Sequence, residues 1–254
     1  MDDDELEGDF LNENFWFKPA VYRMCWEEFR KLPRHPAYRY EYRRGELTIS
    51  GRPRQLNCRL PLETFPVAPT QQTNRSDNFQ QTPLKTSSES RLVELFEQSF
   101  SQTFPYRHLE ARERRRAAES QIGKAFHGSS WPVNDDASQI LINNENQQAV
   151  AAAIITQVPD GNWSDFSDPA WQCRPAKDAA GQKWGVPHLT WIMVDARFQR
   201  RGLAALLLRH ASETVRQQGH THLFSTFHIG NHASMLWHWK QGFQLISADR
   251  PPLI

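Results

Sequence analysis

HLTWIMVDARFQRRGLAALLL, residues 188–208, is the stretch of sequence that decides the expected fold. Residues 188–194 are almost all apolar, which is typical of a strand buried in the centre of a sheet. A helix is predicted from Leu203, because apolar residues then recur at helical spacing and Gly219 stands where a helix end is capped. A central strand that leads through a tight turn into a helix is the layout of an anion-binding site.

The turn before this helix contains the residue types that an anion site needs. The first amides of a helix have no intrahelical partner, and the helix dipole adds a partial positive charge there. Gly202 lets the backbone approach a ligand closely, and the small Ala204 leaves room beside it. Arg200 and Arg201 can add charge-assisted hydrogen bonds to phosphate oxygens. A lone glycine at a helix start is weak evidence, however, because capping alone explains it.

Two further segments follow the helix and give the pattern its specificity. Residues 221–227 predict a strand, and Asn231 can begin a short helix that Gly242 ends. With these segments the chain resembles the GCN5-related N-acetyltransferase (GNAT) family. Residues 199–204 match that family's Q/R-x-x-G-x-G/A pyrophosphate loop, and residues 231–243 resemble its later asparagine, helix and Gly-Phe segment. The resemblance covers residues 84–248 and is strongest over 188–243.

This resemblance implies an α/β (α+β) fold with a mixed, V-shaped central sheet flanked by helices. Acyl-CoA would enter where two parallel strands splay apart, its pantetheine arm pairing with the backbone of residues 192–194. Its pyrophosphate would lie on the amides of residues 200–205. The implied cofactor-binding residues are Ile192, Met193, Val194, Gln199, Arg200, Arg201, Gly202, Leu203, Ala204, Ala205 and Asn231.

The resemblance also implies direct transfer of an acetyl group from acetyl-CoA to a primary amine of a small molecule or peptide. His238 stands where the family often has a tyrosine that protonates the CoA thiolate; it could act as an acid if the site raised its pKa. His188 stands near the place where some relatives keep a glutamate base, on one strand face with Thr190, Ile192 and Val194 by a period of two. Both histidines could equally be packed residues.

A non-catalytic acyl-CoA sensor or interaction module with the same fold is the alternative function. The histidine at position 238, in place of tyrosine, favours it. Against it, transfer of this kind depends mostly on positioning, so an imperfect acid need not abolish activity.

Composition limits the other partners. The 30 Lys+Arg balance 29 Asp+Glu, and glutamates interleave with the charge run 112–116, so no nucleic-acid partner is expected. No apolar run approaches the ~20 residues that span a bilayer, and the acidic N-terminus is unlike a secretory signal. The three cysteines are far apart and fit no metal-ligand spacing. These features predict a cytoplasmic protein without a membrane partner or a metal.

The domain prediction places an N-terminal extension at residues 1–57 and a GNAT-like domain at 58–254. Residues 1–14 read as an acidic tail, and 38–42 with 47–49 as a β-hairpin in an aromatic and basic segment. This extension is expected to pack on the core or to form a homodimer. Residues 157–187 are an insertion that could be a lid or a plain loop.

The remaining elements follow from local patterns. A strand is predicted at 58–62, shortened or placed at an edge by Pro61. Residues 67–83 read as a loop or linker. Ser87 or Ser88 can cap a helix with one apolar face over 92–100, a second helix covers 109–124, and residues 139–142 with 150–155 form a hairpin.

Overall fold

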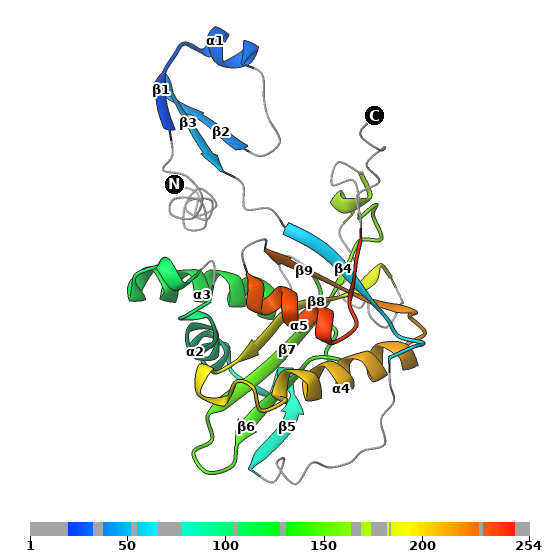
Figure 1. Cartoon of the computed structure of the whole chain (residues 1–254). Helices are drawn as coiled ribbons and strands as arrows, with labels where there is room; N and C mark the ends of the chain where they lie inside the picture. Colours follow the sequence, from blue (N-terminus) through cyan, green and yellow to red (C-terminus); the bar gives the residue numbers. More distant parts are fainter. Residues whose placement is uncertain are drawn as a thin grey trace.

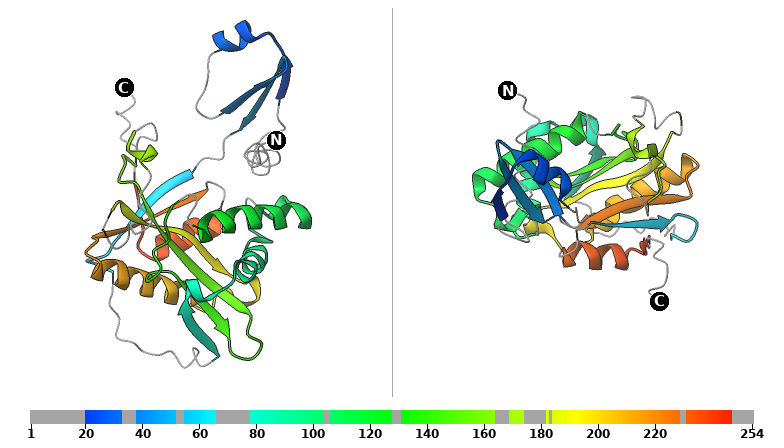
Figure 2. Two further views of the ribbon diagram at one scale, coloured as in Figure 1. Left: turned by 180° about the vertical axis from the view of Figure 1, so that it is seen from behind. Right: turned by 90° about the horizontal axis from the view of Figure 1, so that it is seen from above.

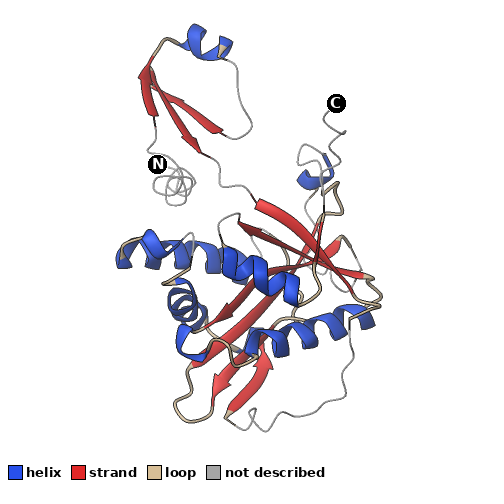
Figure 3. Cartoon of the chain, in the orientation of Figure 1, coloured by secondary structure: helices blue, strands red, loops and turns tan. Residues whose placement is uncertain are grey.

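The computed structural model describes residues 20–32, 38–51, 55–65, 78–103, 106–127, 131–163, 169–173, 182, 184–228 and 231–246. These residues form a seven-stranded sheet with helices, and a separate three-stranded sheet (Figures 1 and 3). The large sheet contains β4 (Gln55–Pro61), β5 (Phe79–Pro83), β6 (Gln139–Asn143), β7 (Ala149–Val158), β8 (Val186–Val194), β9 (His222–His228) and β10 (Gln244–Leu245). The helices are α2 (Glu89–Phe100), α3 (Ala111–Phe126), α4 (Leu203–Gln217) and α5 (His232–Lys240), with short 3-10 turns η2 (Leu84–Thr86), η3 (Tyr106–His108), η4 (Pro169–Gln172) and η5 (Ala196–Phe198).

The large sheet is mixed, as the sequence predicted. Its strand order is β10-β4-β9-β8-β7-β6-β5. Only β8 and β9 run parallel, because α4 returns the chain between them; the other neighbours are antiparallel. The apolar strand β8 therefore lies in the middle of the sheet, where residues 188–194 were expected.

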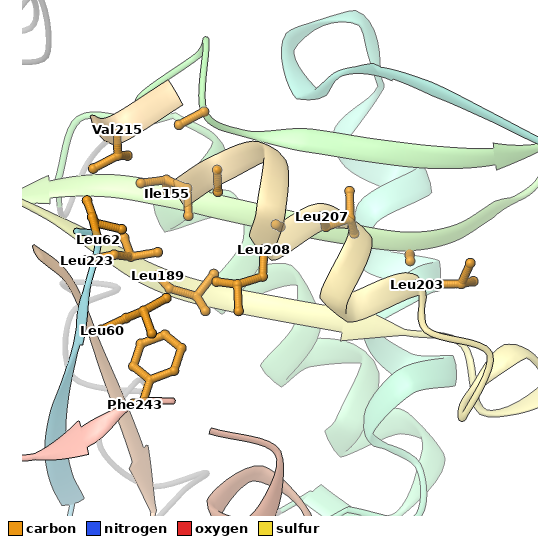
Figure 4. Close-up of a cluster of buried hydrophobic side chains, with 14 of the residues drawn as sticks. Leu60, Leu62, Ile155, Leu189, Leu203, Leu207, Leu208, Val215, Leu223 and Phe243 are labelled. Carbon is orange, nitrogen blue, oxygen red and sulfur yellow. The ribbon is translucent and has the colours of Figure 1, made fainter. Parts of the chain in front are cut away.

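Helices cover both faces of this sheet. The apolar side of α2 and α3 packs on one face around Phe96 and Ile154. On the other face, the leucines of α4 pack on Ile155 and Leu189 (Figure 4). Burial of each such leucine contributes about 1.5–3 kcal/mol, so α4, and with it the turn that precedes it, is fixed firmly against the sheet.

The parallel pair opens into a fork. Backbone pairing between β8 and β9 is limited to His188↔Phe224 and Leu189↔Ser225. Beyond Leu189 the two strands continue without pairing, which leaves the V-shaped opening that the sequence implied. We call this opening between β8 and β9 the fork.

A bulge on β8 corrects one expectation. The register with β7 passes from Ile154↔Trp191 to Ile155↔Leu189, so Thr190 is an extra residue on β8. A bulge reverses which side chains share a face. Leu189, Ile192 and Val194 consequently pack together on the α4 side, and the prediction that His188 and Thr190 share a face with Ile192 and Val194 by a simple period of two is wrong.

Most predicted local elements are present. Ser88 caps α2 by accepting from the Arg91 amide, α3 lies two residues later than the predicted second helix, and β6 and β7 form the predicted hairpin. The loop prediction for residues 67–83 is wrong at its end: β5 pairs with β6 at the sheet edge. Its sequence FQQTP has no apolar alternation, and pairing with the buried β6 decides its conformation. Residues 66–77 lie outside the described residues.

The N-terminal segment forms its own small sheet in the order β1-β3-β2, from β1 (Ala20–Arg23), β2 (Tyr38–Arg43) and β3 (Glu46–Gly51), with helix α1 (Trp26–Lys31). The predicted hairpin is β2 and β3. The rings of Phe29 and Tyr42 stack at 4.9 Å, and Tyr42 donates to the Met24 carbonyl. The left view of Figure 2 shows this sheet apart from the large one. The predicted acidic tail lies outside the described residues, and β4 already begins at Gln55.

The predicted insertion is described only in part. Gln157 belongs to β7 and Pro187 to β8, which narrows the connecting segment to 159–185. Within it the indole of Trp163 stacks on the ring of Phe224 at 4.6 Å and meets Trp171 edge-on at 4.9 Å. Residues 164–168, 174–181 and 183 lie outside the described part of the chain.

Candidate functional site

A pocket of about 400 Å³ lies at the fork, beside the N-terminus of α4. Side chains and backbone from β8, the turn after it, α4, α5 and α2 surround it. Its lining includes most of the predicted binding residues: Ile192, Val194, Gln199, Arg200, Gly202, Leu203, Ala204, Ala205 and Asn231. The sequence therefore identified residues that the fold brings together.

The turn between β8 and α4 is held by Asp195. The Asp195 amide donates to the Val150 carbonyl at 2.9 Å, which anchors the turn to β7. The buried carboxylate accepts from the Arg197 amide at 2.9 Å and from the Arg197 guanidinium at 2.6 Å. Burial acts to raise the pKa of Asp195, but the hydrogen bonds from Arg197 outweigh it and lower the pKa. The carboxylate is thus a charged structural anchor.

The backbone of this turn is shaped to present amides. Arg200 has φ 62° and Gly202 has φ 84°, both in the left-handed region. The first bond that closes α4 runs from the Leu206 amide to the Gly202 carbonyl at 3.0 Å, so the amides of residues 203–205 precede the helical ladder. A Cβ placed on Gly202 would meet no protein atom within 4 Å. The space beside Gly202 is open for a ligand, and the dipole of α4 favours an anion there.

The two arginines of the turn differ in position. Arg200 lines the pocket and is exposed. The Arg201 guanidinium lies 5.0 Å from the centre of the Phe198 ring and donates to the Arg197 carbonyl. Arg200 is therefore the better placed of the two to contact a phosphate.

The strand and α5 contributions agree with the expected layout. Ile192 and Val194 line the pocket, whereas the Met193 side chain is fully buried on the α2 side, so Met193 can act there only through its backbone. Asn231 caps α5 by accepting from the Ser234 amide at 3.0 Å, and it also lines the pocket.

Sequence reasoning missed the wall that α2 supplies. Ser99, Phe100 and Thr103 line the pocket from the end of this helix, with Phe198, Ala233, Ser234, Trp237 and Gln241 as further unpredicted residues. The buried Ser99 hydroxyl has no partner among the described residues, and its place on the apolar face of α2 was the only signal in the sequence.

His238 is a buried side chain behind the pocket. It is 3% exposed, and it packs against Phe227 and Phe243 at 5.2 and 4.8 Å between ring centres. Nδ1 lies 2.8 Å from the Ser234 carbonyl, and Nε2 lies 2.9 Å from the Ser225 hydroxyl. Burial lowers the pKa of His238 to about 4, although the bond to Ser234 opposes the change. This shift is opposite in direction to the raised pKa that an acid role would need.

This depressed pKa predicts acid sensitivity. Between the ordinary value of 6.5 and the folded value of about 4, the unfolded chain binds a proton at His238 that the folded chain does not. Stability therefore falls as the pH drops through this window, and the pKa difference corresponds to on the order of 3 kcal/mol. Urea unfolding at a series of pH values measures it, and the variant His238→Gln should show a shallower slope. An unchanged slope would assign the sensitivity to other groups.

His188 lies at the closed end of the fork, on the sheet face opposite α4. Its Nε2 is 3.1 Å from the Thr226 hydroxyl on β9, and its Nδ1 is 3.0 Å from the Thr190 hydroxyl. The ring keeps some exposure but lies parallel to the Trp163 indole at 5.9 Å. This enclosure, and then the nearby His238, lower the pKa of His188 to about 4. At neutral pH the imidazole is uncharged and able to accept a proton.

Other kinds of site find less support in the described part of the chain. Among those residues no three His, Cys, Asp or Glu side chains gather as metal ligands would. The helices that the structure describes are too short or too polar to cross a bilayer. Cys25, Cys58 and Cys173 are free thiols, and burial raises the pKa of Cys58 to about 12, so this thiol is unreactive.

Comparison with known proteins gives one family and several distant structures. Residues 91–243 match the model of the acetyltransferase (GNAT) family. No curated protein sequence matches the chain significantly. A GCN5-related N-acetyltransferase of Sphaerobacter thermophilus is 10% identical with a TM-score of 0.48, over 77% of this chain and 50% of its own, so the chain spans half of that protein.

Two further solved structures are similar over more of their own length. A PaiA N-acetyltransferase of Thermoplasma acidophilum, in complex with coenzyme A, is 11% identical with a TM-score of 0.45, over 67% of this chain and 92% of its own. An aminoglycoside 6'-N-acetyltransferase of Acinetobacter haemolyticus is 16% identical with a TM-score of 0.39, over 69% of this chain and 96% of its own.

Proposed function

Because the chain belongs to the acetyltransferase (GNAT) family, we propose that it transfers an acetyl group from acetyl-CoA to a primary amine by direct attack. The observation that supports this proposal most strongly is the pocket at the fork, which joins the unpaired end of β8 to the amides that begin α4. A small molecule or a peptide would supply the amine.

The acyl donor would lie along the fork. The backbone of residues 192–194 has no β9 partner, so its polar groups on that side can pair with the amide groups of the pantetheine arm. The amides of residues 200–205 and the Arg200 guanidinium would hold the pyrophosphate. The open space beside Gly202 supports this assignment.

In the reaction, the amine nitrogen would form a bond to the thioester carbonyl carbon, and CoA would leave as its thiolate. A base must take the proton that the attacking nitrogen sheds, and neutral His188 is the candidate in this proposal. Its low pKa makes it a weak base, but it is in the proton-accepting form across the physiological range. Positioning of the two substrates would supply most of the rate enhancement.

The acid role of His238 stays a prediction, and its surroundings give it little support. Neither histidine lines the pocket, and the ring of His238 is also buried. The carbonyl of Ser234 can only accept from the Nδ1 proton of this ring. In neutral His238 the only ring proton is therefore on Nδ1, where it is donated to the Ser234 carbonyl. A free cysteine thiol has a pKa of about 8.5, and a thiol of this kind leaves as its thiolate with only modest help from an acid near neutral pH.

A non-catalytic acyl-CoA sensor remains the second candidate. The observation that favours it is the depressed pKa of both histidines, which leaves the site without a strong base or a charged acid. Calorimetric titration with acetyl-CoA and release of CoA thiol with a panel of primary amines separate the two functions. The transferase requires binding and thiol release with at least one amine; tight binding without turnover on any of them supports the sensor.

Reversal of one charge tests the binding mode. We expect Arg200→Glu to weaken acetyl-CoA binding about 10-fold, and more at low salt, because a pyrophosphate contact becomes a repulsion. Arg209→Glu is the matched control, since Arg209 is exposed on α4 and does not line the pocket. Calorimetry at two salt concentrations measures both variants. Equal effects of the two substitutions on affinity would indicate that the net charge of the protein, rather than a contact at the turn, attracts acetyl-CoA.

The homodimer and the cytoplasmic location stay predictions, as does the absence of nucleic-acid and membrane partners. The domain boundaries 1–57 and 58–254 are retained as a proposal, with Gln55–Asn57 contributing to the large sheet.

A further inference from the structure

A chain of polar side chains crosses the large sheet at the closed end of the fork. Each member comes from a strand and contacts the next member by a hydrogen bond. In order they are Thr156 of β7, Thr190 and His188 of β8, Thr226 of β9 and Asn57 of β4, with separations of 2.7, 3.0, 3.1 and 3.0 Å. Asn57 is 6% exposed, so water does not compete freely for its amide.

The direction of these bonds follows from one backbone carbonyl. The Trp163 carbonyl can only accept, so it fixes the Asn57 amide nitrogen as its donor at 3.1 Å. The Asn57 oxygen then faces Thr226, whose single hydroxyl proton is directed to it. Thr226 consequently has only a lone pair for His188, and Nε2 of the imidazole must be the donor.

The other ring nitrogen is therefore the acceptor. A neutral imidazole carries one N–H, so Nδ1 presents its lone pair to Thr190. Thr190 lies 3.0 Å from Nδ1 but 3.4 Å from the His188 carbonyl, so its proton has the shorter bond to Nδ1. Thr156, 2.7 Å away, completes the chain by donating to Thr190.

We propose that Asn57 is a positioning residue that acts through Thr226 and keeps the proton of His188 on Nε2. The lone pair on Nδ1 then points along β8 toward Thr190, the first residue of β8 beyond its pairing with β9. The group that orients Asn57 is the carbonyl of Trp163, and the indole of the same residue covers the His188 ring. Trp163 therefore influences both the tautomer of the imidazole and its enclosure.

The effect of Asn57 on turnover rests on the proposed function, in which His188 is the base. The tautomer of His188 does not depend on that proposal. In the reaction, one proton leaves the attacking amine nitrogen for the Thr190 oxygen while the Thr190 hydroxyl proton moves to Nδ1. The imidazole then carries two N–H groups and one positive charge, and no electron is transferred. With the proton on Nδ1 instead, this route would be closed.

The tautomer is measurable without any substrate. Two-bond ¹H–¹⁵N correlation spectra of the full-length protein at pH 7 distinguish protonated from bare ring nitrogens. A His188→Gln variant identifies the signals of this residue among those of the 10 histidines. We expect the N–H on Nε2 in the wild type. A wild-type ring with its proton on Nδ1 would overturn the proposal.

Substitutions test the role of Asn57. Asn57→Asp keeps an oxygen acceptor for Thr226 and should preserve the tautomer, whereas Asn57→Leu removes the acceptor and should populate the Nδ1 form. Thr226, which lies between Asn57 and His188, allows the same comparison. Thr226→Ser keeps the hydroxyl and should preserve the tautomer, whereas Thr226→Val removes it and should populate the Nδ1 form. An unchanged tautomer in both Asn57→Leu and Thr226→Val would contradict the proposal, and thermal unfolding checks that each variant is folded.

Kinetics separate this inference from the proposed function. For Asn57→Leu we expect kcat to fall about 10-fold with little change in KM for acetyl-CoA, and Asn57→Asp should recover most of the loss. If the protein transfers no acetyl group, the proposed function fails while the spectra still decide the tautomer. If transfer occurs and the tautomer is as expected but kcat does not respond in Asn57→Leu, positioning by Asn57 fails.

Discussion

Gly202→Val should reduce the affinity for acetyl-CoA by on the order of 100-fold to 1000-fold. Valine does not readily adopt the φ of 84° found at Gly202, so the backbone would turn and redirect the neighbouring amides. A bond from an amide to a charged oxygen contributes about 1.5–3 kcal/mol, and loss of two such bonds at the lower end, about 1.5–2 kcal/mol each, gives this range. The added side chain would also project into the space where no protein atom lies within 4 Å. Calorimetric titration with acetyl-CoA measures the loss.

Gly219→Val is the matched control for this substitution. Gly219 has φ 90° and ends the same helix α4, far along the chain from the turn. Both variants should lose about 1–2 kcal/mol of stability from the same backbone strain. Only the Gly202 variant should lose affinity. If Gly202→Val bound acetyl-CoA with wild-type affinity, the turn would not be part of the binding site. Equal losses of affinity in the two variants would show that destabilisation of α4 causes the effect.

Replacement of His188 should have the largest effect on turnover. General base catalysis contributes about 100-fold to 10,000-fold, so we expect His188→Ala to lower kcat about 1000-fold while the Kd for acetyl-CoA stays unchanged. His222→Ala is the control, because His222 is a histidine of the neighbouring strand β9 whose ring contacts the Thr221 hydroxyl rather than the polar residues around His188. Steady-state kinetics with an amine found in the thiol-release panel provide the measurement. A loss below about 5-fold would exclude His188 as the base.

The pH profile gives an independent check on the same residue. Enclosure and the nearby His238 hold the pKa of His188 near 4, so the imidazole is neutral above that pH. The profile of kcat/KM should therefore show no inflection near 6.5 from this group, and its acidic limb should reflect the amine substrate. An inflection at 6.5 that disappears in His188→Ala would show that the ring is solvated during turnover.

Much of the fold was predictable because its signals are local. Periodicity identified β8 and α4, and capping residues such as Ser88 and Asn231 placed the starts of α2 and α5. Each of these signals depends on neighbours within about one turn of helix or a few residues of strand. The polar strand β5 had no such signal, because its conformation depends on pairing with β6.

The residues of the candidate site also differ in whether local sequence could predict them. The turn from Gln199 to Gly202 was predictable, since a helix N-terminus after a central strand presents amides whatever surrounds it. The wall from Ser99 and Phe100 was not, because these residues lie about 100 positions before the turn and reach the pocket only through the packing of α2 on the sheet.

The sequence by itself determined that strand, turn and helix would follow one another at residues 188–208 and that the turn could bind an anion. The tertiary structure alone decided the chemistry of the two histidines. Their pKa values depend on how much water the fold removes and on which distant groups it brings near, and no local pattern carries that information. For the same reason, only the folded chain shows that Asn57 and Thr226 face His188 across three strands.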